Sequence, residues 1–142
     1  MLNGAYLHVQ YADDIRDEAD ERCSILGCFS RGNMLRILGQ QPILLKRLAL
    51  LGSLCVPDEV SIQTIRISIK ENDHLIADLD VSHLLNEPDA LPLPNGERLN
   101  PRMFSFELKL DGLTLQGPTV FAVSAFVNDF EVKGTRFFIT NE

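Results

Sequence analysis

The chain has 142 residues, of which 45% are hydrophobic and 23% are charged, and its formal net charge is −7. This length fits one domain, residues 1–142, with a core of its own, and the composition excludes extensive disorder. The acidic balance makes nucleic acid an unlikely partner, because nucleic-acid binding depends on Lys and Arg at the phosphates. No apolar run of about 18 residues predicts a membrane span, and the first residues lack a signal-peptide pattern, so we expect a cytoplasmic protein without a membrane partner.

Charge and cysteine are unevenly distributed along the chain. Residues 31–70 carry six basic and two acidic groups, whereas the segments on both sides are acidic. The three cysteines, Cys23, Cys28 and Cys55, are an odd number without a dense spacing pattern. We therefore expect reduced, buried thiols rather than a disulfide framework.

The first elements are two apolar runs separated by an acidic segment. Residues 6–11 alternate apolar and polar side chains, which predicts a half-buried strand, and residues 22–30 form a second apolar run. Residues 13–21, DDIRDEADE, lie between them. A helix is disfavoured there, because like charges would share one face and no apolar stripe is present. We interpret the segment as a loop with six acidic groups: Asp13, Asp14, Asp17, Glu18, Asp20 and Glu21.

The structure of residues 31–47 stays open between strand and helix. Pro42 marks a boundary, because the residue before a proline avoids the helical region. Residues 44–48 are compatible with a helix by propensity, whereas residues 48–56 are typical of a buried strand.

The second half of the chain predicts strands joined by turns and one long connection. Residues 64–70 alternate strictly and pair with residues 75–81 in a hairpin whose turn is at 71–74. A Pro-rich connection follows at 83–101. The last strands are expected at 104–110, ended by Asp111 and Gly112; at 119–127, central and covered on both faces; and at 131–140.

Seven to nine short strands without an amphipathic helix indicate an all-β fold. The expected architecture is an antiparallel β-sandwich, immunoglobulin-like in the broad sense. The chain contains no Trp, and its cysteines do not have the spacing of an antibody domain.

Several short stretches resemble a known family. They include residues 11–13, 24–29, 48–56 and 71–73, and the ending with 117–121, 127–129 and 137–139. In these stretches the chain resembles the family called domain of unknown function 6941. The resemblance implies a compact β-sandwich of bacterial or phage origin, and it brings no assigned activity, cofactor or catalytic residue.

No residue pattern predicts catalysis or metal binding. The chain lacks nucleophile-elbow, phosphate-loop and dinucleotide-loop motifs, so no catalytic or cofactor-binding residue is assigned and an enzyme is not expected. In an EF-hand register that starts at Asp13 or Asp17, the third position falls on Ile15 or Ala19, which cannot ligate calcium. Zinc is not expected, because the following residues lack ligand spacing: Cys23, Cys28, Cys55, His8, His74 and His83.

These observations favour a non-enzymatic protein-binding module that uses loops or exposed strand edges, with self-association through the same edges as a further expectation. One alternative is a binder or enzyme for a small anionic ligand, held by four basic residues: Arg31, Arg36, Lys46 and Arg47. A second alternative is an acidic mimic that engages a basic partner through residues 13–21. The partner, the ligand and the biological process are not predicted by the sequence.

Overall fold

The computed structural model describes residues 3–19, 22–27, 29, 33–37, 42–86 and 102–140. Within these residues the chain forms strands and a single 3-10 helix, η1 (Ser82–Asn86), which confirms the all-β class. The strands are β1 (Tyr6–Ala12), β2 (Asp14–Asp17), β3 (Cys23–Leu26), β4 (Met34–Arg36), β5 (Ile43–Val56), β6 (Ile65–Glu71), β7 (His74–Asp80), β8 (Arg102–Leu115), β9 (Thr119–Val127), β10 (Phe130–Lys133) and β11 (Phe137–Thr140). The predicted count of seven to nine was too low, partly because the short strand β2 had been interpreted as loop.

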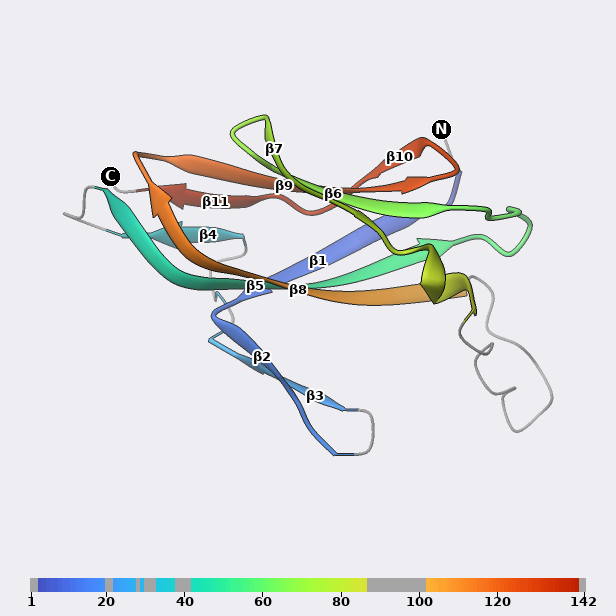
Figure 1. Ribbon diagram of the computed structural model, residues 1–142, viewed down its shortest axis with the longest axis horizontal. Coiled ribbons are helices and arrows are strands. Elements are labelled where there is room, and N and C mark those ends of the chain that lie inside the picture. Colours follow the sequence, from blue (N-terminus) through green and yellow to red (C-terminus); the bar gives the residue numbers. More distant parts are fainter. Residues whose placement is uncertain are drawn as a thin grey trace.

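The strands form three sheets (Figure 1). One has three strands in the order β1-β5-β8, and one has six, in the order β4-β11-β9-β6-β7 with β10 also paired to β9. The third is the two-stranded β2-β3 hairpin. Among the described residues all strand pairs are antiparallel except β4 with β11, which is parallel, so the expected antiparallel arrangement holds apart from this one pair.

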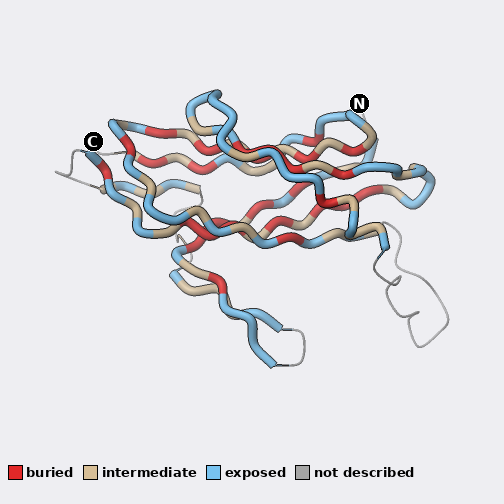
Figure 2. Tube along the Cα trace, in the orientation of Figure 1, coloured by how far each residue is buried: buried red, intermediate tan, exposed pale blue. Residues whose placement is uncertain are grey.

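One hydrophobic cluster draws its side chains from both larger sheets, and Figure 2 shows buried residues on both. Phe121 of β9 and Phe137 of β11 are its largest fully buried side chains. Tyr11 of β1 stacks on Phe137 with ring centroids 4.8 Å apart, and its hydroxyl donates a hydrogen bond to the Thr135 carbonyl at 2.6 Å. The three-stranded sheet is thereby joined to the strand that closes the chain.

The β6-β7 hairpin confirms the predicted turn. Asn72 and Asp73 have φ values of 47° and 67°, the left-handed conformations of a two-residue turn that matches the strand twist. No residue of β7, which lies at the edge of the six-stranded sheet, is buried.

The long strands decide two further expectations. Residues 44–48 belong to strand β5 and are not helical. β8 does not end at Asp111 and Gly112: pairing with β5 continues from Arg47↔Asp111 to Leu45↔Leu113. The φ of Gly112 is 66°, a conformation that glycine adopts without steric penalty, so the strand passes through it.

β9 is central, as predicted, since it pairs with β6, β10 and β11. Its outer face is half-buried rather than covered, since its residues alternate between buried and intermediate exposure. The predicted Pro-rich connection at 83–101 begins within η1, and residues 87–101 lie outside the described residues. No helix within the described ranges has the length and hydropathy to cross a membrane.

Candidate functional site

The acidic segment is largely a hairpin and not a loop. We call residues 13–27 the acidic arm. β2 and β3 pair from Asp14↔Leu26 to Asp17↔Cys23, and the Glu18 amide extends the ladder by donating to the Arg22 carbonyl at 2.7 Å. The arm projects from the three-stranded sheet (Figure 1), and most of its described residues are exposed or half-buried (Figure 2).

A single buried side chain explains why this polar segment is ordered as a strand. Ile15 is 1% exposed, pairs with Ile25, and belongs to a strand that lies against β5. Asp17 and Glu18 are exposed farther out on the arm, whereas Asp20 and Glu21 lie outside the described residues. The Ser24 hydroxyl donates to Glu18 Oε1 at 2.9 Å.

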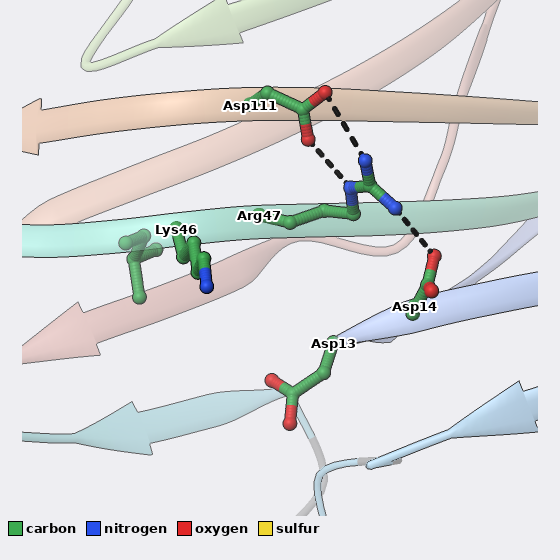
Figure 3. A pocket seen from close by; sticks show the side chains of 6 residues that line it. Asp13, Asp14, Lys46, Arg47 and Asp111 are labelled. Atoms are coloured by element: carbon green, nitrogen blue, oxygen red, sulfur yellow. Dashed lines mark hydrogen bonds and ion pairs between the residues drawn. The ribbon is translucent and has the colours of Figure 1, made fainter.

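Arg47 of β5 connects the arm to the sheet. Its Nη1 lies 3.0 Å from Asp14 Oδ1, and its Nε lies 2.5 Å from Asp111 Oδ1 on β8 (Figure 3). Lys109 Nζ also approaches Asp14 Oδ1, at 3.3 Å. We call Asp14, Arg47, Lys109 and Asp111 the Arg47 network. It joins three strands that are distant in sequence.

The network favours the charged forms of Asp14, Asp111 and Arg47. Hydrogen bonding to Arg47 is the largest cause that lowers the pKa of both Asp14 and Asp111 below the ordinary value of 3.8. The same two carboxylates, Asp111 first, raise the pKa of the Arg47 guanidinium. All four side chains keep contact with solvent, at 26% exposure for Asp14 and 60% for Asp111, so salt weakens these pairs.

An open pocket of about 700 Å³ lies beside the network. It is lined by Asp13, Asp14, Leu45, Lys46, Arg47 and Asp111. In Figure 3 Arg47 extends between the two aspartates that it contacts, while Lys46 points to one side. These six residues offer carboxylates, one amine and one guanidinium, and no thiol, hydroxyl or imidazole.

The four predicted anion ligands do not form one group. Lys46 and Arg47 line the pocket, but Arg36 lies on β4 in the six-stranded sheet, and Arg31 lies outside the described residues. The described residues of segment 31–47 are divided between two sheets, because β4 belongs to the six-stranded sheet and β5 to the three-stranded sheet. Arg47, moreover, contacts two carboxylates, which neutralise the charge that an anionic ligand would require.

The remaining candidates are dispersed. The predicted burial of the thiols holds for Cys55, which is fully buried, but not for Cys23, which is exposed; Cys28 lies outside the described residues. His8, His74 and His83 are exposed on β1, β7 and η1. Within the described part of the chain, no three His, Cys, Asp or Glu side chains are grouped as metal ligands would be.

Sequence periodicity missed the exposed edge β7. Leu75, Ile76 and Leu79 are 57%, 39% and 38% exposed on this strand of seven residues. Strand β8 is the corresponding edge of the three-stranded sheet, and it is fourteen residues long. Period-2 alternation indicates which side chains share a face of a strand, but it does not indicate whether the strand is central or at an edge.

Comparison with models of known protein families found no match, and a search among curated proteins found no similar sequence.

Proposed function

We propose that the chain is a non-enzymatic protein-binding module, and that β7, the edge of the six-stranded sheet in the described part of the chain, is its principal binding element. The observation that carries the proposal is the exposure of Leu75, Ile76 and Leu79 on one edge strand. Unpaired backbone groups along an edge can hydrogen-bond to an extended segment of another protein, and neighbouring apolar side chains add burial and specificity.

Charge and backbone geometry at β7 restrict the kind of partner. The strand carries Asp78 and Asp80, and its pairing with β6 shifts register between Ile69 and Lys70. Such an irregularity interrupts regular edge-to-edge association. Arg66 already lies 4.0 Å from Asp78, and the Ser82 amide donates to Asp80, so the partner's main requirement is an extended segment with apolar side chains.

We also propose an architecture for the two larger sheets. We interpret the two larger sheets as the layers of a β-sandwich that is immunoglobulin-like in the broad sense. The shared hydrophobic cluster supports this interpretation, because sandwich cores are built from the inner faces of both sheets. Membership of the family called domain of unknown function 6941, a bacterial or phage origin and a cytoplasmic location stay predictions.

A capture experiment tests the role of β7. Wild-type chain and the double variant Leu75→Ser/Leu79→Ser are immobilised, and proteins retained from a native-host extract are quantified. Leu44→Ser is the matched control, since Leu44 is 58% exposed on β5 and Leu75 is 57% exposed on β7. The proposal expects a partner that the wild type and the control retain and the double variant loses. Equal retention by all three would exclude β7 as the binding element.

The acidic arm supports a second candidate function, binding to a basic surface. Asp17 and Glu18 are exposed on an arm that projects from the sheet (Figure 1). The variant Asp17→Asn/Glu18→Gln tests this function without disturbing Asp14, which holds the arm through Arg47. Loss of a captured basic partner with unchanged thermal stability supports it. Unchanged capture would show that the arm's outer acids are not used.

The anionic-ligand alternative has the weaker geometry, because Arg47 is neutralised and Arg36 is on another sheet. A thermal-shift screen with nucleotides and phosphorylated metabolites tests it directly. A specific ligand raises the melting temperature by mass action. A rise that is abolished by Lys46→Ala would restore this alternative.

A further inference from the structure

The edge strand β8 differs from β7 in ways that favour regular pairing. β8 is fourteen residues long, and among the described strands it pairs only with β5, as the last strand of its sheet. From Arg102 to Asp111 its pairing with β5 has a single register, from Val56↔Arg102 to Arg47↔Asp111, without the shift seen beside β7. A regular, long edge is a template for another strand.

The side chains of β8 separate cleanly by face. The face toward the core carries Phe104, Leu108 and Leu110, which are only partly buried, and Phe106, which is 8% exposed. The opposite face carries Ser105, Glu107, Lys109 and Asp111, which are all exposed. An added strand would cover apolar area on the first face and meet charges on the second.

The sequence around Leu108 is complementary to itself when antiparallel. In a pair centred on Leu108, Glu107 of one copy lies opposite Lys109 of the other, and the reverse pair repeats the contact. On the core face, Leu108 lies opposite its own copy and Phe106 lies opposite Leu110. Opposite charges directly across an antiparallel pair stabilise it, whereas like charges destabilise it.

The backbone is compatible with the same register. Alternate residues of an edge strand direct their N–H and C=O groups to the free side. In this register every pair joins two even-numbered or two odd-numbered residues. The residues whose N–H and C=O groups face the free side in one copy therefore lie opposite the equivalent residues of the other copy, so these groups can hydrogen-bond. The regular part extends from Ser105 opposite Asp111 to Asp111 opposite Ser105, and beyond it Gly112 departs from extended geometry with a φ of 66°.

We propose that a second copy of this chain pairs with β8 in this register, forming a continuous six-stranded sheet in the order β1-β5-β8-β8-β5-β1 across a two-fold axis at Leu108. Lys109 already contacts Asp14 at 3.3 Å, and its ammonium has three donors, so it can contact Glu107 of the second copy as well. Dimerisation through β8 goes beyond the proposed function, since it uses another edge and leaves β7 free.

Charge reversal tests both the partner and the register. Sedimentation equilibrium measures the dimer dissociation constant of the wild type, Glu107→Lys, Lys109→Glu and the double variant. Each single variant places like charges opposite each other twice and is expected to weaken the dimer by about tenfold or more. The double variant exchanges the signs and is expected to restore the dimer. Glu131→Lys and Lys133→Glu on β10 are the matched controls and should leave the dissociation constant unchanged.

The decisive part of the experiment is a mixture of the two single variants, Glu107→Lys and Lys109→Glu. A copy with lysine at 107 and 109 complements a copy with glutamate at both positions, so an equimolar mixture should form a heterodimer although neither variant dimerises well alone. A wild type that stays monomeric at concentrations up to about 1 mM would overturn the inference. So would a mixture that fails to associate. Either result leaves the β7 capture experiment untouched, so the two proposals fail separately.

Discussion

Asp14 of the acidic arm lies 3.0 Å from Arg47 of β5, with Asp14 Oδ1 contacting Arg47 Nη1. The contact joins an acidic residue and a basic residue that the sequence had assigned to two different binding surfaces. Because each satisfies the charge of the other, neither is free for a separate ligand. The arm is thereby attached to the sheet at its base, and its outer acids remain exposed.

The Arg47 network predicts a loss of stability at acid pH. Arg47 lowers the pKa of Asp14 and Asp111 in the folded chain below the ordinary value of 3.8. Groups with a lowered folded pKa stabilise the fold above the unfolded pKa, and this stability is lost as the pH falls through the folded values. Urea unfolding between about pH 5 and pH 2 should therefore show a steeper decline for wild type than for Asp14→Asn/Asp111→Asn. Parallel curves would contradict the prediction.

Gly52 and Phe106 form a cross-strand pair that requires glycine. The two residues are paired between β5 and β8, and a Cβ added to Gly52 would overlap the Phe106 ring. Gly52→Ala should lower the free energy of unfolding by about 1–3 kcal/mol through overpacking. Gly117→Ala is the control, because no heavy atom lies within 4 Å of a Cβ there. Denaturant titration of both variants measures the difference, and an equal effect would exclude the packing explanation.

The turn at Asn128 and Asp129 predicts opposite effects at adjacent positions. Both residues have positive φ, at 49° and 70°. Asn128 Oδ1 accepts from the amides of Gln63 and Thr64, so Asn128→Gly should cost about 1–2 kcal/mol despite the relief of strain. Asp129→Gly should stabilise by up to about 1 kcal/mol, because glycine adopts this conformation freely. Melting temperatures that move in the same direction would count against this account.

Removal of the buried Tyr11 hydroxyl is expected to lower the stability of the fold. Tyr11 is 3% exposed, burial raises its pKa well above the usual range, and its hydroxyl donates to the Thr135 carbonyl at 2.6 Å. Tyr11→Phe should lower the unfolding free energy by about 1 kcal/mol, since the ring packing remains and the hydrogen bond is lost. Urea titration checks this, and a variant as stable as wild type would show that water satisfies the carbonyl equally well.

The all-β class, the strand spanning residues 48–56, the β6-β7 turn and the central position of β9 were predictable from periodicity and turn residues. β2 was not predicted, because Ile15 is its single apolar residue. The burial of that side chain, which is 1% exposed, involves a strand distant in sequence. The Arg47 network was also beyond prediction. Its residues are 33 and 64 positions apart, and no local spacing signals their contact.

The exposure of β7 shows the limit of periodicity most clearly. Leu75, Ala77 and Leu79 alternate as the inner face of a strand would, yet none of them is buried. Burial depends on which other parts of the fold cover a strand, because β1 is also an edge strand and yet has four buried residues. The candidate binding edge was therefore found from the topology and not from the pattern.

Amide hydrogen exchange of the chain with and without its captured partner tests the central claim most directly. If β7 is the binding element, the amides of residues 74–80 that face the free edge should exchange more slowly in the complex, because they donate to the partner's backbone. The amides of β9, which are already paired in a central strand, should be unchanged. Protection confined to the acidic arm, or no protection in β7, would contradict the claim.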